Sequence, residues 1–505
     1  MNLKAFFSFF VKDSYYYLFL LAAIILYAIT AYHSHGFYQG DAHYQIIEFA
    51  NLKLGVNGVN DMPWEYHEKI RPSLQPMIAY FFLKLFRIFN LNDPYAIAFM
   101  FRLLSCGLYL LVIHYFIKQT ISQFSSKQVV KYYYFTSFFL YFMPYLSIQF
   151  SSENWSGIFL LLGLAYYFNS NEKLNNPIVL GLIFGTSFLF RFQIAFAIVT
   201  FFLWVLFVRK ESFKFLSKNL LGIVIMVLFG TIIDTWFYQD IVFTPWNYFY
   251  QNIIEGKASS FGVSPWSFYY NEIINKSLYK LGVPIVIACL VTIFIKPKNV
   301  FIWIVLVYFF IHSLIPHKEL RFIFSIVSLL PIIHVYAVEW WLRLFDKNKG
   351  LKKINQFFIL GYGIVHVILV LGYSQYNENY IINGTTKFIY ETYKGKEVRL
   401  NFYGDYYSAD FCEEDYLPMK FYFDDSTKFV KLASLENLEF KIKKASDVDL
   451  FLIDQLSLDN DTKMKLDNLG YKLVFTGKPD WLVSLSKLKN NGDSTNSLLF
   501  VLEKS

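Results

Sequence analysis

Between Leu220 and Trp236 the sequence reads LLGIVIMVLFGTIIDTW, a run with a single charged residue. A transmembrane helix needs about 20 predominantly apolar residues, so this run and its flanks predict a membrane-spanning helix. Similar runs recur along the chain: Tyr15–Thr30, Val283–Ile295, Phe301–Ile315 and Phe357–Leu371. The sequence therefore predicts an all-α polytopic membrane protein with about 11 transmembrane helices.

The charge distribution supports this prediction. The chain has 505 residues, of which 55% are hydrophobic and 17% charged, whereas soluble domains are about 25% charged. The net charge of +8 is concentrated in alternate loops, which the positive-inside rule places in the cytoplasm, so we expect no nucleic-acid partner. The basic residues in these loops are Lys4 and Lys12; Lys118, Lys127 and Lys131; Arg209, Lys210, Lys214 and Lys218; Lys296 and Lys298; and Arg343, Lys347, Lys349, Lys352 and Lys353.

Two domains are expected from the change in composition after Gly372. Residues 1–373 form the predicted transmembrane domain, with outer loops 33–94 and 238–277. Residues 374–505 follow an odd number of spans and are predicted to be extracytoplasmic. Short alternating runs in this part, such as Lys396–Tyr403 and Tyr471–Phe475, indicate a small α/β or α+β domain.

A group of charged residues lies between two apolar spans on the predicted outer side, where the positive-inside rule disfavours Lys and Arg. It comprises His317, Lys318, Glu319 and Arg321. One interpretation is a cluster of interfacial anchors. The interpretation that we favour is an anion site, because His, Lys and Arg at one helix start can converge on phosphate. Arg191, at the outer end of another span, could serve as an anchor or face the same site.

The first outer loop adds a candidate general base. Asp41 follows the first span closely, at the depth where a lipid-linked headgroup would lie, although a lone Asp in a loop is also typical of a helix N-cap. His43 lies near His33 and His35, but no zinc-ligand spacing joins the three. We expect no metal and no cofactor, because an anion that is held by fixed cations needs none.

Three regions of the sequence resemble a known family. The stretch HKELRF (His317–Phe322) resembles the His-Lys-Glu-x-Arg-Phe signature of the endoplasmic-reticulum α-mannosyltransferases that use dolichyl-phosphate mannose, within the glycosyltransferase-C superfamily. The stretches TPWNYF (Thr244–Phe249) and SPWSFY (Ser264–Tyr269) look most like the GPI mannosyltransferases. In the first loop, Asp41–Glu48 and PWEY (Pro63–Tyr66) are similar to the family pattern. The resemblance covers roughly residues 15–345.

Departures from the family pattern concern the acceptor. Ala42 follows Asp41 where the family has a second carboxylate, Tyr66 replaces a Trp, and Pro72 interrupts an Arg-Ser pair. One carboxylate can nevertheless suffice, because a polyprenyl phosphate leaves as a stabilised anion and needs no protonating acid, unlike the leaving group in glycoside hydrolysis.

The resemblance implies an inverting α-mannosyltransferase. It would move mannose from a polyprenyl-phosphate-mannose donor to a lipid-linked glycan or related glycolipid acceptor on the outer membrane face, lumenal or periplasmic. Asp41 would be the general base. The donor phosphate would be bound by His317, Lys318, Arg321, Arg71 and Arg191. Supporting or substrate-binding roles fall to Glu48, Trp64, Glu65, Trp246, Asn247, Trp266 and Glu319, although each Trp could equally belong to an interfacial aromatic belt.

The sequence is also compatible with other functions. The same architecture could serve a transferase or polymerase for another lipid-linked sugar. A lipid or glycan flippase is the alternative from another class, but the paired helix breaks of many transporters are absent from the sequence. The composition favours a multi-pass protein of a bacterial cytoplasmic membrane, or of the endoplasmic reticulum in a eukaryote, with membrane lipid around it.

Overall fold

The structure is a computed structural model. It describes residues 13–36, 39–169, 176–276, 282–345, 349–375 and 380–403, then 412–413, 417–423, 426–432, 448–454, 458–477 and 497–503. The chain divides into two compact units. We call them the helical unit (Met1–His33, Lys69–Gln75 and Phe101–Tyr376) and the loop–sheet unit (Ser34–Glu68, Pro76–Met100 and Asn377–Ser505).

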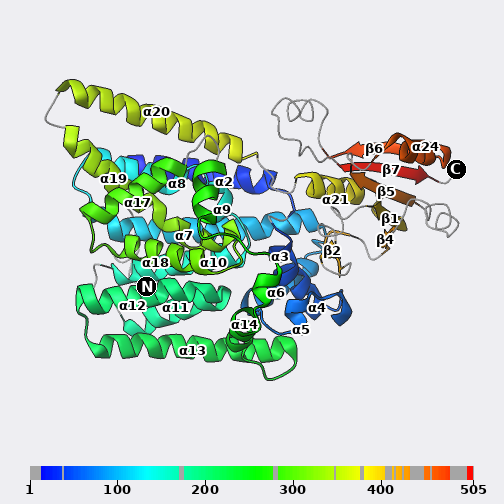
Figure 1. The fold of residues 1–505 in the computed structure, drawn as a ribbon, viewed down its shortest axis with the longest axis horizontal. Helices are drawn as coiled ribbons and strands as arrows, with labels where there is room; N and C mark the ends of the chain where they lie inside the picture. The colour runs from blue at the N-terminus through cyan, green and yellow to red at the C-terminus, as the bar shows by residue number, and fades with distance from the viewer. Residues whose placement is uncertain are drawn as a thin grey trace. The chain divides into compact units, whose positions relative to one another are not determined.

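The helical unit is a bundle of apolar helices joined by short connections (Figure 1). Its main elements are α2 (Ser14–His33), α7 (Pro94–Thr120), α8 (Lys127–Phe139), α9 (Met143–Ser147), α10 (Ser152–Tyr167), α11 (Pro177–Phe190), η5 (Phe192–Ile194), α12 (Ala195–Trp204), η6 (Val205–Arg209), α13 (Phe213–Tyr238), α17 (Gly282–Ile295), α18 (Val300–Leu314), η10 (Leu320–Leu329), α19 (Leu330–Phe345) and α20 (Lys349–Tyr373). Between α13 and α17 lie α14 (Thr244–Phe249), η7 (Tyr250–Ile254), α15 (Lys257–Ser260), α16 (Phe268–Asn271) and η8 (Glu272–Lys276).

Six helical stretches in the described part of the chain are long and apolar enough to cross a membrane. They are Ser14–His33, Pro94–Gln123, Phe192–Arg209, Phe213–Tyr238, Leu320–Phe345 and Lys353–Tyr373. Three shorter apolar helices, α11, α17 and α18, lie in the same bundle. These helices confirm the predicted multi-pass membrane architecture.

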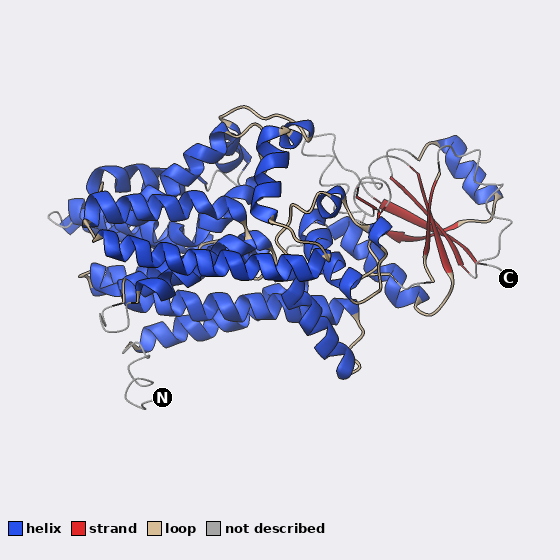
Figure 2. Cartoon of the chain, turned by 90° about the horizontal axis from the view of Figure 1, so that it is seen from below, coloured by secondary structure: helices blue, strands red, loops and turns tan. Residues whose placement is uncertain are grey.

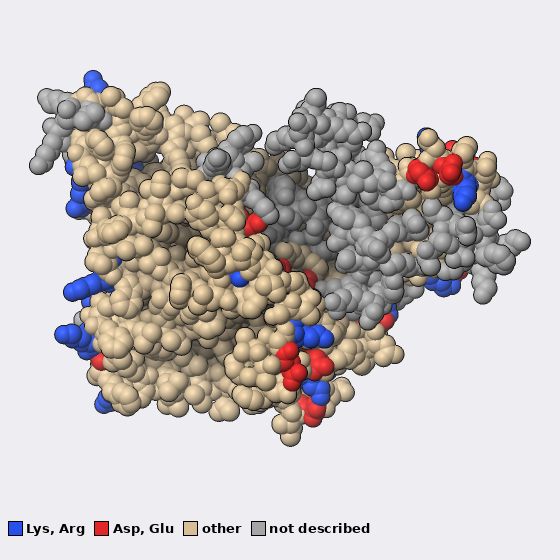
Figure 3. Space-filling model, in the orientation of Figure 1, with Lys and Arg blue, Asp and Glu red and all other residues tan. Residues whose placement is uncertain are grey.

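Basic residues gather at one end of the bundle, along the left edge in Figure 3. The last turns of α7, η6 and α19 carry Lys118, Arg209 and Arg343. Arg209 Nε donates to the hydroxyl of Tyr167 at the end of α10, 3.3 Å away. The start of α10 therefore lies at the opposite end of the bundle, which is the polarity that the positive-inside rule predicts.

Helices α11 and α13 pack backbone against backbone. A Cβ added at Gly181 of α11 would lie 2.0 Å from the carbonyl oxygen of Asn219, and one added at Gly222 of α13 would lie 2.2 Å from that of Ile178. At Gly185 it would lie 2.5 Å from Cβ of Met226. Small residues at such positions allow close helix approach in membranes, where lipid provides no hydrophobic drive for association.

The loop–sheet unit combines the first outer loop with the C-terminal segment. Its helices are α3 (Gly40–His43), η1 (Tyr44–Glu48), α4 (Phe49–Lys53), η2 (Val59–Asp61), α5 (Trp64–His67), most of α6 (Leu74–Ile88), α21 (Tyr380–Tyr393) and α24 (Asn460–Asn468). Its strands are β1 (Val398–Tyr403), β2 (Cys412–Glu413), β3 (Leu417–Pro418), β4 (Lys428–Lys431), β5 (Val448–Asp454), β6 (Lys472–Thr476) and β7 (Ser497–Glu503).

Five strands form one mixed sheet in the order β4-β1-β5-β7-β6, drawn red in Figure 2. Strand β1 pairs in parallel with β4 and β5, whereas β7 is antiparallel to β5 and β6. Alternate residues of β5 face two cores. Leu450 packs with Leu400 of β1 and Ile389 of α21, and Phe451 packs with Leu466 of α24. This sheet with its helices confirms the predicted small C-terminal α/β or α+β domain.

The close contact between α11 and α13 generates the first prediction. A leucine side chain at position 222 would overlap the backbone of α11. Gly222→Leu should therefore lower the melting temperature in detergent and reduce the free energy of unfolding by about 1–3 kcal/mol through overpacking. The matched control is Gly361→Leu in α20, where an added Cβ would meet nothing within 4 Å. Thermal unfolding followed by size-exclusion chromatography measures both, and equal melting temperatures would contradict the packing.

Candidate active site

The HKELRF stretch lies in the connection between α18 and η10. Asn299 caps α18 by accepting from the backbone N–H groups of Phe301 and Ile302. The helix ends at Leu314, and Ile315 is extended, as a residue that precedes a proline favours. The charged residues therefore follow directly after an apolar helix. Because α18 begins beside the basic loops, this connection lies at the opposite end of the bundle.

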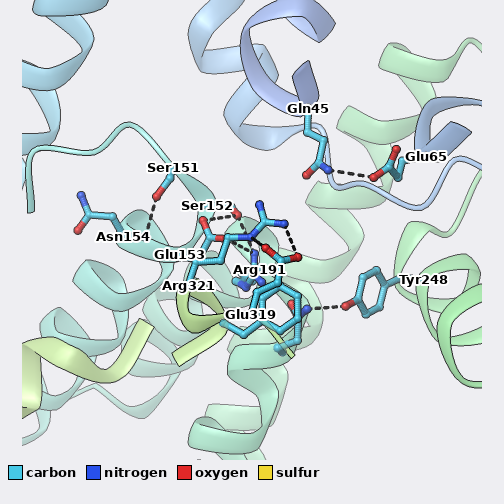
Figure 4. Close-up of polar contacts among 12 residues, drawn as sticks. Gln45, Glu65, Ser151, Ser152, Glu153, Asn154, Arg191, Tyr248, Glu319 and Arg321 are labelled. Atoms are coloured by element: carbon cyan, nitrogen blue, oxygen red, sulfur yellow. Dashed lines mark hydrogen bonds and ion pairs between the residues drawn. The ribbon is translucent and has the colours of Figure 1, made fainter. Parts of the chain in front are cut away.

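Arg321 is held by Glu319 in a two-point ion pair. Its Nε and Nη2 atoms donate to the two carboxylate oxygens of Glu319, each at 2.8 Å (Figure 4). Oε1 of Glu319 also lies 3.2 Å from Nε2 of His317. Such two-point arginine–carboxylate pairs fix the plane of the guanidinium group as well as its position.

Lys318 and His317 hold the SPWSFY stretch. Lys318 Nζ donates to the carbonyl oxygen of Ser264 at 2.8 Å, and burial lowers the pKa of this ammonium group. The Ser264 N–H donates to the Pro316 carbonyl oxygen at 3.0 Å. His317 Nδ1 lies 3.1 Å from the carbonyl oxygen of Gly262. The two stretches, far apart in sequence, thus form one connected structure.

Glu153, which was not predicted from the sequence, lies between two arginines. It is in the first turn of α10 and is 4% exposed. Arg191 Nη1 donates to its Oε1 at 2.7 Å, and Arg321 Nε lies 4.0 Å from the same oxygen (Figure 4). The signal in the sequence was a single carboxylate between two apolar runs, but an acidic residue in the first turn of a helix is common because it favours the helix dipole.

Arg191 directly follows α11 and is 5% exposed. Its guanidinium carbon lies 5.2 Å from the centre of the Phe322 ring, and that of Arg321 lies 5.5 Å from the same ring. The carboxylates Glu153 and Glu319 balance the charges of Arg191 and Arg321 in this cluster, and Lys318, next to Glu319 in the sequence, adds a third cation. A cluster with this excess of positive charge can accept an anion.

The TPWNYF stretch starts a helix whose apolar face points outward. Exposed side chains recur at helical spacing along α14 and η7, in the order Trp246, Phe249, Tyr250, Ile253 and Ile254. Soluble proteins place the apolar face inward, whereas a helix in a membrane interface exposes it to lipid. Trp246 is 57% exposed and Trp266 75% exposed.

The inward side of the same helix is polar. Asn247 Nδ2 donates to the carbonyl oxygen of Lys69 at 3.3 Å, and the Tyr248 hydroxyl bonds to Gln193. Arg71, which follows two residues after Lys69, is half-buried, and its carbonyl oxygen accepts from the Tyr238 hydroxyl at 2.8 Å.

The remaining candidates belong to the loop–sheet unit. Asp41 is half-buried in the first turn of α3, whose N-cap is Gln39, so Asp41 does not cap this helix. Glu65 is buried and accepts from Gln45 Nε2 at 3.0 Å, while Trp64 is half-buried. The structure therefore groups Asp41, Glu48, Trp64 and Glu65 in one unit and Arg71, Arg191, Trp246, Asn247, Trp266 and His317–Arg321 in the other.

Glu48 is a buried anchor rather than an accessible carboxylate. Its oxygens accept from Asn51 at 3.1 Å, from Asn57 at 2.7 Å and from the Phe421 N–H at 3.0 Å. Oε1 also lies 2.8 Å from His43 Nε2. Glu48 thereby joins the first outer loop to the C-terminal segment. Across the described residues, no group of three or more His, Cys, Asp or Glu side chains could hold a metal ion.

Glu48 should make the stability of its unit depend on pH. Burial raises the pKa of this carboxyl group, but the hydrogen bond and charge of His43, with the bonds from Asn57 and Phe421, outweigh it and lower the pKa. The stabilisation is therefore present above the unfolded-state pKa of about 4.3 and is lost as the pH falls through the folded-state value.

Glu48→Gln should consequently lower the free energy of unfolding by about 1–3 kcal/mol at pH 7. The difference in melting temperature from the wild type should stay constant down to about pH 5 and shrink as the pH falls below about 4.3. Glu391→Gln is the control, because Glu391 is exposed and pairs with Lys387 at 3.8 Å on the surface of α21. Thermal melts from about pH 7 down to about pH 3 test the prediction. A constant difference between wild type and Glu48→Gln would refute it.

Known proteins resemble this chain in sequence and in fold. The curated relatives include GPI mannosyltransferase 3 of Candida albicans, 25% identical over 350 residues that cover 69% of this chain and 67% of the relative. Two similar solved structures are ArnT of Cupriavidus metallidurans bound to undecaprenyl phosphate and in the apo state. The TM-scores are 0.59 and 0.54, and each has 11% identity. The alignments cover 97% and 96% of this chain and 98% and 97% of the respective ArnT chains.

These solved structures show that this chain has the ArnT fold. The model of the Alg9-like mannosyltransferase family matches residues 15–409, most of the chain. The protein therefore belongs to the Alg9-like mannosyltransferase family and is a multi-pass membrane mannosyltransferase.

Proposed function

We propose that the enzyme transfers mannose from a polyprenyl-phosphate-mannose donor to a lipid-linked glycan or related glycolipid, with inversion at the sugar carbon. The observation that carries the proposal is the buried cluster of Arg191, Arg321 and Glu153 at the end of the helical bundle opposite the basic loops. The structural similarity to an ArnT bound to undecaprenyl phosphate supports a polyprenyl-phosphate donor.

The cluster is suited to the donor phosphate. Nε of Arg191 is buried and makes no hydrogen bond to any described residue. A buried N–H without a partner is unfavourable, so it favours a ligand that supplies an acceptor oxygen. Glu153 and Glu319 keep the guanidinium groups of Arg191 and Arg321 oriented before the donor arrives, which reduces the reorganisation needed in the transition state.

The reaction is a single displacement. Asp41 accepts the proton of the acceptor hydroxyl group, whose oxygen forms a bond to the anomeric carbon of mannose. The bond between this carbon and the phosphate oxygen breaks, and the electron pair leaves with polyprenyl phosphate. The arginines stabilise the negative charge that develops on the phosphate, so no residue needs to protonate the leaving group.

The exposed stripe on α14 and η7 supports a lipid-linked substrate. Its apolar side chains are placed to contact membrane lipid, while Asn247 and Tyr248 on the other side bond to Lys69 and Gln193 of the helical unit. A helix with this polarity separates hydrocarbon from a polar site. A substrate that carries both a polyprenyl chain and a phosphate needs such a boundary.

The proposal is tested by reconstituting the enzyme in proteoliposomes with tritium-labelled polyprenyl-phosphate mannose and a lipid extract of the host. Label should enter a glycolipid, and Arg321→Ala should raise the donor KM about 10- to 150-fold, since a charged hydrogen bond is worth about 1.5–3 kcal/mol. The control is Arg343→Ala, an exposed arginine of the basic end that pairs with Glu339.

Three results would count against the proposal. Transfer from polyprenyl-phosphate glucose but not mannose would identify another sugar. Movement of the donor without covalent transfer would indicate a flippase. A normal donor KM in the Arg321→Ala variant would leave the cluster as a structural anchor.

Asp41→Asn should separate chemistry from binding. An amide cannot accept the hydroxyl proton but keeps the shape of the carboxylate, so kcat should fall about 10²- to 10⁴-fold while the donor KM stays within about twofold. Asp61→Asn is the control in the same loop, because Asp61 pairs with Lys420. A near-normal kcat in a folded Asp41→Asn enzyme would show that another residue is the general base. Loss of folding would show that Asp41 has a structural role.

A further inference from the structure

A second buried carboxylate lies in the helical unit, outside the arginine cluster. Asp234 is the single charged residue of the run Leu220–Trp236 and is 2% exposed. A carboxylate in an apolar helix requires hydrogen-bond partners, because its desolvation is costly. Asp234 has three: Oδ1 accepts from the Ser73 N–H at 2.8 Å and from Ser73 Oγ at 2.5 Å, and Oδ2 accepts from Thr244 Oγ1 at 2.5 Å.

These bonds fix a short segment, Lys69–Ser73, which we call the Arg71 segment. The Tyr238 hydroxyl donates to the Arg71 carbonyl oxygen at 2.8 Å, and Lys69 Nζ pairs with Asp240 at 2.5 Å. Together with Asp234, these contacts attach the segment to the end of α13 on both sides of Arg71. Pro72, between Arg71 and Ser73, removes a further backbone rotation.

The same contacts explain why the TPWNYF stretch carries polar side chains at Thr244 and Asn247. Thr244 at its start donates to Asp234, and Asn247 donates to the carbonyl oxygen of Lys69. Both conspicuous polar side chains of the stretch therefore act on the Arg71 segment, one through Asp234 and one directly. Neither needs to contact a substrate to account for its position.

We infer that Asp234 is a positioning residue that holds Arg71 in the orientation that binds the donor phosphate, an inference that rests on the proposed function and on the donor-binding role that the family resemblance implies for Arg71. Asp234 acts on Arg71 indirectly, through its hydrogen bonds with Ser73. A shift of about 1 Å in a binding group can cost about 100-fold in rate, so the several contacts on so short a segment have a functional reason.

The alternative is that Asp234 only stabilises the fold, and a double-mutant cycle separates the two. Asp234→Asn keeps the side-chain shape, but its amide nitrogen cannot accept from the Thr244 hydroxyl. If Asp234 acts through Arg71, then removing Arg71 should also remove the effect of changing Asp234. A general effect on the fold would instead persist in the absence of Arg71.

The experiment measures the Kd of the detergent-solubilised full chain for undecaprenyl phosphate, by native mass spectrometry. Arg71→Ala should raise the Kd about 10- to 150-fold, and Asp234→Asn should raise it on the order of 10-fold. The double variant should differ from Arg71→Ala by less than about twofold. Thr231→Val is the matched control one turn earlier in α13, where the hydroxyl donates only to the Val227 carbonyl oxygen at 3.0 Å, and it should leave the Kd unchanged.

Thr244 provides a second measurement in case Asp234→Asn does not fold. Thr244→Val removes the donor of the hydrogen bond to Asp234 and should raise the Kd, as Asp234→Asn does. Thr244→Ser retains the hydroxyl group and should bind undecaprenyl phosphate like the wild type. Equal Kd values for the two Thr244 variants would overturn the inference.

The remaining outcomes distinguish this inference from the proposed function. Additive effects of Arg71→Ala and Asp234→Asn on the Kd would show that Asp234 acts on the fold, which overturns the inference alone. An unchanged Kd in Arg71→Ala, with a raised Kd in Arg321→Ala, would also overturn it alone. Normal binding in both arginine variants would overturn the proposed function and the inference together.

Discussion

The buried ion pair between Glu153 and Arg191 is the interaction on which the arrangement of the site depends. Removing one partner of such a pair typically costs about 3–5 kcal/mol, because the other charge is left without compensation in a medium of low dielectric constant. Arg321 lies beside the same carboxylate and is fixed by Glu319. The pair therefore keeps the start of α10, the end of α11 and the start of η10 together at one end of the bundle.

Most of the fold could be predicted from the sequence because lipid imposes a simple rule on it. Backbone groups in hydrocarbon must bond within their own helix, so long apolar runs such as Leu220–Trp236 become helices whatever their neighbours are. The C-terminal strands were also predictable, since the alternation over Lys396–Tyr403 matches the two-residue repeat of β1. Both signals are local in the sequence.

The site was harder to predict because its contacts are distant in the sequence. The HKELRF stretch identified Arg321, but its letters do not show that Lys318 bonds to the Ser264 backbone. Glu153 resembles any acidic residue at a helix start. Glu48 resembles an accessible carboxylate until the backbone of Phe421, 373 residues further along the chain, is placed against it. Sequence patterns identify residue types at these positions, whereas their partners depend on the tertiary fold.

The glycine contacts between α11 and α13 have a mechanical consequence. Arg191 directly follows α11, and Asp234 belongs to α13. At the glycines the backbones of these two helices are in contact, with no side chains between them. A bilayer that becomes thinner or thicker changes helix tilt at a modest cost. These two helices would tilt together as one rigid body. The distance between the cluster of Arg191, Arg321 and Glu153 and the Arg71 segment would therefore not depend on the lipid composition of the host membrane.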